Sequence, residues 1–264
     1  MEVGINLYTK WPFQEVIDAF VENGIEHTFV CAEQPQFEEA MAALKRANIT
    51  VDNLHAPFKN LNRIWSEDEA TGEEMLCLLR QGVDQCADHG VGLMVAHVSN
   101  GKPMPPIIEA GLARYDRLMD YAREKGVSIA FESHRFLENV QFFMERYPQV
   151  GFCLDNGHED AFTPGVRYAK FWGDRLVATH ISDNECVCDV DMHMLPFDGH
   201  IDFDLAAREL AECGYEGTLM LEIKPGNHVR YADVAIRDYY KTAAQRIRQF
   251  AAMVERYRNI RNGI

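Results

Sequence analysis

The sequence has little positive charge for its size and contains no long apolar run. Its 264 residues include 26 lysines and arginines against 41 aspartates and glutamates, which gives a formal net charge of −15. Because basic side chains supply most of the affinity for a phosphate backbone, this balance argues against a nucleic-acid partner. No apolar stretch approaches the roughly 20 residues that span a bilayer, so we expect no membrane segment.

The sequence shows no paired cysteine framework, and we expect no secretory leader. The seven cysteines are odd in number and scattered, and most fall within expected helices or strands. A free thiol in such a position behaves as a small apolar residue, and this usage is typical of a reducing compartment. Residues 3–8 have a strand-like pattern directly after Met1, where a signal peptide would have charged and apolar regions. We therefore expect a cytoplasmic protein.

Short apolar runs alternate with longer helical patterns about eight times along the chain. The expected strands cover residues 3–8, 26–31, 50–55, 92–98, 127–132, 151–155, 176–181 and 218–223. The expected helices cover residues 11–22, 36–47, 68–89, 106–125, 137–147, 165–172, 203–213 and 231–258. Near-continuous apolar strands joined by helices indicate a parallel sheet whose outer side is covered.

Eight such units in a chain of this length are typical of a single (β/α)8 TIM barrel, which we expect to span residues 1–264 as one domain. Hydrophobic residues make up 47% of the sequence, which is ample for one core. A doubly wound open sheet is the alternative, but no Gly-rich phosphate loop follows any expected strand. No repeat, low-complexity segment or linker divides the chain.

Acid or histidine residues stand at the ends of six successive apolar runs. These residues are His55, His97, Glu132, Asp155, His180 and Glu222. A chargeable side chain at the end of a buried strand loses solvation, which is costly unless it finds a partner or a metal. The carboxyl ends of TIM-barrel strands meet at one face, where the active site lies. The six residues therefore predict one shared site.

Four of these residues form the predicted metal site. Glu132, Asp155, His180 and Glu222 belong to the last four expected strands, which are neighbours in a closed barrel. Three carboxylates and one imidazole suit a Mn, Zn, Mg or Co ion and leave room for substrate oxygens. We therefore expect a divalent metal cofactor on these four side chains.

The segments around these residues resemble the xylose isomerase-like superfamily of sugar isomerases, epimerases and apurinic-site endonucleases. The matching segments are 131–134 (FESH), 154–158 (LDNGH), 179–184 (THISDN) and 191–203 (DMHMLPFDGHIDF). Their order and spacing extend the resemblance over nearly the whole chain. It implies a TIM barrel that holds a divalent metal through the four residues of the predicted metal site.

For the keto-sugar epimerases and isomerases, the resemblance implies that Glu132 and Glu222 form an acid/base pair, with His158 close to the substrate. In these enzymes the two glutamates flank the carbon that loses its proton. Ketose epimerases of this group have an Asp-x-Arg whose arginine contacts the substrate, whereas this chain has DMH at 191–193. Because a histidine can ligate metal and an arginine cannot, His193 weakens the match and leaves a second metal open.

For the endonucleases, the resemblance implies three zinc ions on nine ligands, and this chain offers a candidate for each. The nine are His55, His97, Glu132, Asp155, His158, His180, Asp191, His193 and Glu222. A trinuclear zinc phosphodiesterase acting on apurinic DNA is therefore the alternative function, although the acidic chain and short loops argue against it. A barrel that only binds a sugar-like ligand is a third hypothesis, and a pair of opposed glutamates argues against that.

Two more residues are candidates for substrate contact. His134 follows Glu132 by two positions, and Lys224 follows Glu222 by two, on the same face of its strand. A lysine at that position suits an anionic substrate group.

We therefore predict a metal-dependent isomerase or epimerase whose partner is a small sugar or sugar phosphate. The catalytic residues would be Glu132 and Glu222, and the substrate contacts would be His134, His158, His193 and Lys224. The sequence leaves open the identity of the sugar, the kind and number of metal ions, and the choice between proton transfer and hydride shift. A homo-oligomer is compatible with the sequence and is equally open.

Overall fold

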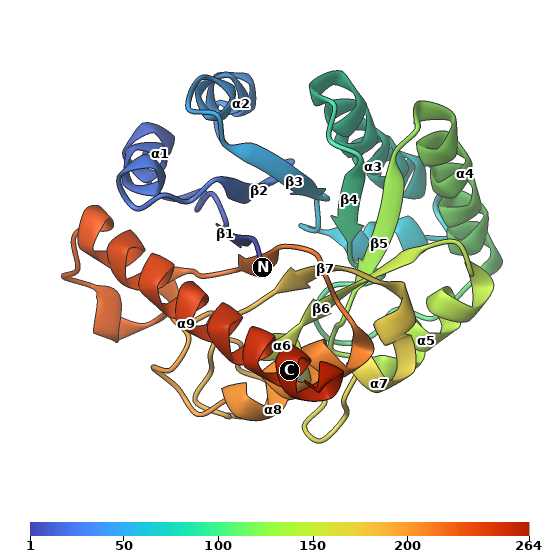
Figure 1. Cartoon of the computed structure of the whole chain (residues 1–264). Helices are drawn as coiled ribbons and strands as arrows, with labels where there is room; N and C mark the ends of the chain where they lie inside the picture. The colour runs from blue at the N-terminus through green and yellow to red at the C-terminus, as the bar shows by residue number, and fades with distance from the viewer. Residues whose placement is uncertain (264) are drawn as a thin grey trace.

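Eight parallel strands form a nearly closed barrel in the computed structural model, which describes residues 1–263 (Figure 1). The strands are β1 (Val3–Ile5), β2 (His27–Cys31), β3 (Thr50–His55), β4 (Leu93–Ala96), β5 (Ser128–Glu132), β6 (Gly151–Asp155), β7 (Leu176–His180) and β8 (Leu219–Leu221). They hydrogen-bond in the order β7-β6-β5-β4-β3-β2-β1-β8. The predicted single (β/α)8 TIM barrel is confirmed.

The ring is closed between β7 and β8 by Ile181, the residue after β7. Its N–H donates to the Met220 carbonyl at 2.8 Å, and its carbonyl accepts from the Glu222 N–H at 3.0 Å. Ile181 also pairs with Leu221 in parallel. This closure brings the residue after β8 beside the end of β7, where two predicted site residues stand.

Helices surround the barrel and cover the outer side of the sheet (Figure 1). They are α1 (Phe13–Glu22), α2 (Phe37–Arg46), α3 (Glu69–His89), α4 (Glu109–Lys125), α5 (Leu137–Arg146), α6 (Asn156–Phe162), α7 (Ala169–Trp172), α8 (Phe203–Cys213) and α9 (Ile236–Asn262). The helix expected from residue 231 begins later, because a short 3-10 turn occupies Val229–Tyr231. Over residues 1–263, no helix is both long enough and apolar enough to cross a membrane.

The structure corrects the sequence prediction after β6. A single helix was expected over residues 165–172, but α6 begins at residue 156, directly after the strand, and α7 covers only 169–172. Asp155 caps α6, since its Oδ1 accepts a hydrogen bond from the His158 N–H at 2.8 Å. Such a cap stabilises a helix by about 1 kcal/mol. The cap fixes His158 in the first turn of α6, beside the end of the strand.

Alternation along the strands separates an outer core from the barrel interior. Phe152 in β6 packs outward against Trp172, with ring centroids 5.2 Å apart. Cys153, the next residue, faces inward and packs with Ala130 and Ala178 in a small buried cluster. Because successive strand residues point to opposite faces, Asp155 at the strand end faces the interior like Cys153. The same alternation directs the predicted site residues into the mouth of the barrel.

Candidate metal centre and substrate cavity

Four predicted metal ligands from adjacent strands meet at the carboxyl end of the barrel. Glu132, Asp155 and His180 end β5, β6 and β7, and Glu222 directly follows β8. One ligand atom from each residue lies within 4.8 Å of the others, and all four side chains are buried. His180 Nδ1 lies 2.8 Å from Glu132 Oε1 and 3.3 Å from Glu222 Oε2, so it links the two glutamates. Together they form a candidate metal site.

A second group of possible ligands adjoins Glu132. His55 ends β3 and His97 follows β4, and their Nε2 atoms lie 3.2 and 2.8 Å from Glu132 Oε2. The two imidazole nitrogens are 3.2 Å apart. Glu132 therefore belongs both to this group and to the four-residue cluster.

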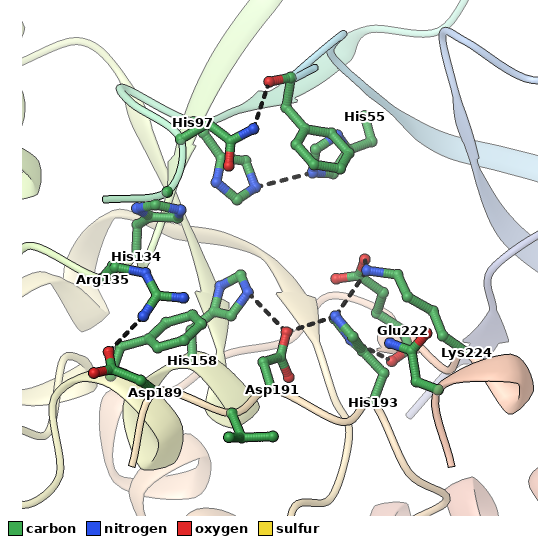
Figure 2. Close-up of a pocket in the computed structure, with 16 residues that line it drawn as sticks. His55, His97, His134, Arg135, His158, Asp189, Asp191, His193, Glu222 and Lys224 are labelled. Atoms are coloured by element: carbon green, nitrogen blue, oxygen red, sulfur yellow. Dashed lines mark hydrogen bonds and ion pairs between the residues drawn. The ribbon is translucent and has the colours of Figure 1, made fainter. Parts of the chain in front are cut away.

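A third group joins His158 of α6 to two residues of the loop after β7. Asp191 Oδ2 is 3.3 Å from His158 Nε2 and 2.6 Å from His193 Nε2 (Figure 2). Beyond it, His193 Nε2 is 2.7 Å from Lys224 Nζ, which in turn contacts Glu222 Oε1 at 2.8 Å. The structure thus brings together all nine residues named as ligand candidates, in three groups that share one end of the barrel.

The loop that carries Asp191 and His193 is held in place by Asp183. The Asp183 carboxylate accepts hydrogen bonds from the backbone N–H groups of Gly199 at 2.8 Å and Ile201 at 3.0 Å. Its backbone pairs with Met194 in both directions, at 2.9 and 3.0 Å. His193 itself adopts a φ of 48°, which is uncommon for a residue other than glycine. The loop is therefore built to hold the His193 side chain over the barrel.

Burial and nearby charge have opposing effects on the pKa values of the carboxylates in the four-residue cluster. Burial would raise the pKa of Glu132 and Glu222, but His180 beside Glu132 and Lys224 beside Glu222 hold both pKa values well below their usual range. For Asp155 burial outweighs the attraction of nearby His158, and the pKa rises to about 7. The ionised form of these buried carboxylates therefore depends on positive charge close by.

A divalent cation fits this donor set. Asp155 Oδ2 is buried and has no hydrogen-bond partner within the part of the chain described, so one carboxylate oxygen is free to act as a ligand. Three carboxylates and an imidazole are ligands that divalent ions accept. A cation would also supply the positive charge that the clustered carboxylates require.

A cavity of about 450 Å³ opens over these groups, and we call it the first cavity. All four predicted substrate-contact residues line it, together with one glutamate: His134, His158, His193, Lys224 and Glu222. The other residues of the four-residue cluster are at most 1% exposed and lie behind this lining. A volume of this size is typical of small-molecule sites, and the polar lining suits a polyol.

A second cavity of about 570 Å³ adjoins the first at the ends of β1 and β2. The residues that line both are His55, Phe58, Glu222, Lys224 and Asn227. The remaining walls of the second cavity are more apolar and include Leu7, Tyr8 and Phe29. The Phe29 ring stacks on the imidazole of His180 with centroids 4.4 Å apart. A bound molecule can therefore extend from the polar cavity across an apolar floor.

Sequence analysis did not single out Cys153 as part of the site. One ligand atom of Cys153 lies within 4.8 Å of those of Glu132 and His180. Burial raises the pKa of its thiol to about 12, so it stays neutral. The available signal was its position two residues before Asp155 in the same strand, which puts both side chains on one face.

Arg135 lines the first cavity beside its neighbour His134. Six more lining residues were missed: Asn100, Gly101, Phe162, Asp189, Val190 and Asn227. They stand in or beside the connections that follow the strands, where the barrel rule predicts function. The rule does not say which loop residues point inward, because loop conformations depend on contacts with other loops.

A family model for the xylose isomerase-like TIM barrel matches residues 15–257. The protein y4fM of Sinorhizobium fredii, which is uncharacterised, is 29% identical over 182 residues. That match covers 63% of this chain and 57% of the relative, so the chain spans little more than half of the relative's length.

Solved structures with the same fold cover nearly the whole chain. The IolI protein with a bound zinc atom gives a TM-score of 0.78 at 19% identity, over 97% of this chain and 99% of that one. A xylose isomerase domain protein from Alicyclobacillus acidocaldarius gives 0.76 at 20% identity, with the same coverage. D-psicose 3-epimerase from Clostridium cellulolyticum with D-tagatose gives 0.74 at 15% identity, over 96% and 99%. At these identities the likeness shows the fold.

Proposed function

We propose that this chain, which belongs to the xylose isomerase-like TIM barrel family, is a divalent-metal-dependent isomerase or epimerase of a sugar or sugar phosphate. The observation that carries the proposal is the position of two glutamates on either side of one imidazole nitrogen. Glu132 and Glu222 both contact His180 Nδ1; Glu222 lines a polar cavity of sugar size, and Glu132 lies behind that lining. The sugar epimerases among the proteins of the same fold support this choice.

The metal would be held by the four-residue cluster of Glu132, Asp155, His180 and Glu222. Zinc in the IolI protein supports a metal in this fold, and Mn, Mg or Co would suit the same ligands. A divalent ion bound there would polarise a carbonyl and a neighbouring hydroxyl of the sugar and so acidify the C–H between them.

The two glutamates would then move the proton. Glu222 lines both cavities, so its carboxylate would face a bound sugar and take the proton from the carbon. Lys224 Nζ donates to Glu222 Oε1 at 2.8 Å and fixes the orientation of that carboxylate. Glu132 returns a proton to the opposite face, or to the adjacent carbon in an isomerase. His134, His158 and His193 orient the hydroxyl groups along the cavity wall.

A substrate screen in deuterated water tests this proposal. The compounds would be ketoses, their phosphates and cyclic polyols, with product followed by NMR. We expect the product to carry solvent deuterium at the carbon that receives the returned proton, because that proton comes from the second glutamate, whose carboxyl group exchanges with solvent. Product without deuterium would contradict the role of the two glutamates and favour a hydride shift. If none of these compounds were converted, the proposed function itself would be wrong.

One observation favours a second candidate function, a trinuclear zinc phosphodiesterase that acts on apurinic DNA. The second and third ligand groups, His55 with His97 and His158 with Asp191 and His193, provide donors for ions beyond the four-residue cluster. The net charge of −15 opposes it, because few counterions would be released on binding a duplex.

We therefore expect no retention or incision of a duplex containing an abasic site at moderate salt. The measurement is a gel-shift and incision assay on a labelled oligonucleotide, with the undamaged duplex as the matched control. Efficient incision that is lost in His97→Ala and His193→Ala variants would replace the isomerase proposal with the phosphodiesterase.

A further inference from the structure

Asp189, at one edge of the first cavity, is the shared acidic partner of two cations. Asp189 Oδ2 accepts from Lys102 Nζ at 2.6 Å, and Asp189 Oδ1 accepts from Arg135 Nη1. The three residues come from different loops, which follow β4, β5 and β7. Arg135 and Asp189 line the cavity on the side opposite Lys224 (Figure 2). We call Arg135 and Lys102 the cation pair.

Arg135 is positioned by more than its acidic partner. Its guanidinium carbon lies 3.8 Å from the centre of the Phe162 ring, and its side chain is only 17% exposed. Its Nε is buried and has no hydrogen-bond partner among residues 1–263. This planar guanidinium packs on an aromatic ring and has an N–H donor without a partner. Such a group is suited to bind a carboxylate or phosphate through two hydrogen bonds.

Asp189 is more exposed than Arg135. Its side chain is 42% exposed, and its φ of 64° lies in the left-handed region, which residues other than glycine rarely adopt. Exposed ion pairs contribute little to stability, because solvent screens them and both side chains lose rotamer freedom. An incoming anion that makes the same contacts can therefore displace the Asp189 carboxylate.

The cation pair lies next to the candidate ligands. The Phe162 ring that supports Arg135 also packs on the imidazole of His158, with centroids 5.1 Å apart. Lys224, in contrast, already contacts Glu222 at 2.8 Å and His193 at 2.7 Å, so its charge is engaged among those residues. The arginine edge is therefore the better place for an anionic substrate group.

We propose that Arg135 and Lys102 bind an anionic group of the substrate, and that Asp189 occupies this position until the substrate arrives. The inference rests on the proposed function and narrows its substrate class to acidic sugars, either sugar phosphates or sugar acids. The anionic group would lie at the Arg135 edge, while the sugar carbons extend past His158 toward Glu222.

Calorimetric titration with inorganic phosphate and with acetate tests this site without requiring turnover. For Asp189→Asn we expect about fivefold tighter binding of at least one probe, because the side chain no longer competes with the anion for the cation pair. This is the scale of an exposed ion pair. For Arg135→Met we expect binding at least about tenfold weaker, the scale of a lost charge-assisted hydrogen bond. Tighter binding of phosphate would indicate a sugar phosphate, and tighter binding of acetate a sugar acid.

Matched controls are Asp233→Asn and Lys241→Met, which change exposed charges elsewhere and should leave the affinity within about twofold. Unchanged affinity in both Asp189→Asn and Arg135→Met would overturn the proposal. So would a loss of binding in Lys224→Met that exceeds the loss in Arg135→Met, since the anion would then lie at the other edge. Because binding is measured, a negative result leaves the isomerase proposal standing, and failure of the substrate screen leaves the anion site testable.

Discussion

A Glu222→Gln variant should turn over substrate at least about a hundredfold more slowly than the unaltered protein, and Glu132→Gln should do the same. Glutamine keeps the size of the side chain and part of its capacity for metal, but it cannot accept a proton at neutral pH. The loss of a positioned general base commonly costs this much or more. The measurement is kcat and KM for the substrate that the deuterium screen identifies.

Three checks keep this prediction specific. Glu145→Gln removes an exposed carboxylate on α5 and should leave kcat unchanged. Metal content must be measured for each variant, because both glutamates are also candidate ligands. A variant that keeps its metal and its thermal stability yet retains near-normal kcat would contradict the assignment of that glutamate as an acid/base residue.

Removing Asp155 or His180 should abolish tight binding of a divalent ion. Each substitution deletes one of four ligand atoms that lie within 4.8 Å of one another. The loss of a residue that merely supports a ligand costs about 10–100-fold in metal affinity, so the loss of a ligand should cost at least about a hundredfold. Elemental analysis of the purified protein should find at least one ion per chain, and Asp155→Ala and His180→Ala should lack it.

Asp155 allows a sharper version of this experiment, because its carboxylate also caps α6 through the His158 N–H. Asparagine is a good helix cap but a poor metal ligand, so Asp155→Asn should lose the metal while α6 keeps its first turn. Asp155→Ala should lose both and unfold at a lower temperature. Full metal occupancy in Asp155→Asn and His180→Ala would show that the four-residue cluster is not the metal site.

The strand ends were predictable from the sequence because two physical requirements coincide there. A buried parallel strand reads as a continuous apolar run, and a charged residue at its end is rare unless something pairs with it. Glu132, Asp155 and His180 each meet both conditions, so their clustering at one face follows from the barrel itself. Their role as metal ligands stays a prediction.

The loop contacts were not predictable in the same way. The pairing of Asp189 with Lys102 joins residues 87 positions apart, and no local pattern marks either of them. The start of α6 was missed because Asp155 both ends the strand and caps the helix that follows it directly. Both features depend on which segments meet in space, and that is decided by the packing of the whole barrel.

The ligand candidates are distributed unevenly around the barrel, which has a consequence for how its substrate range can change. The nine ligand candidates come from β3 to β8 and the connections that follow them, whereas β1, β2 and the residues after them contribute none and instead line the second cavity. A change at Leu7 or Tyr8 would alter the shape available to the far end of a substrate and leave every ligand candidate in place. We therefore expect substitutions in this sector to change which molecules fit the second cavity while the ligand candidates stay in place.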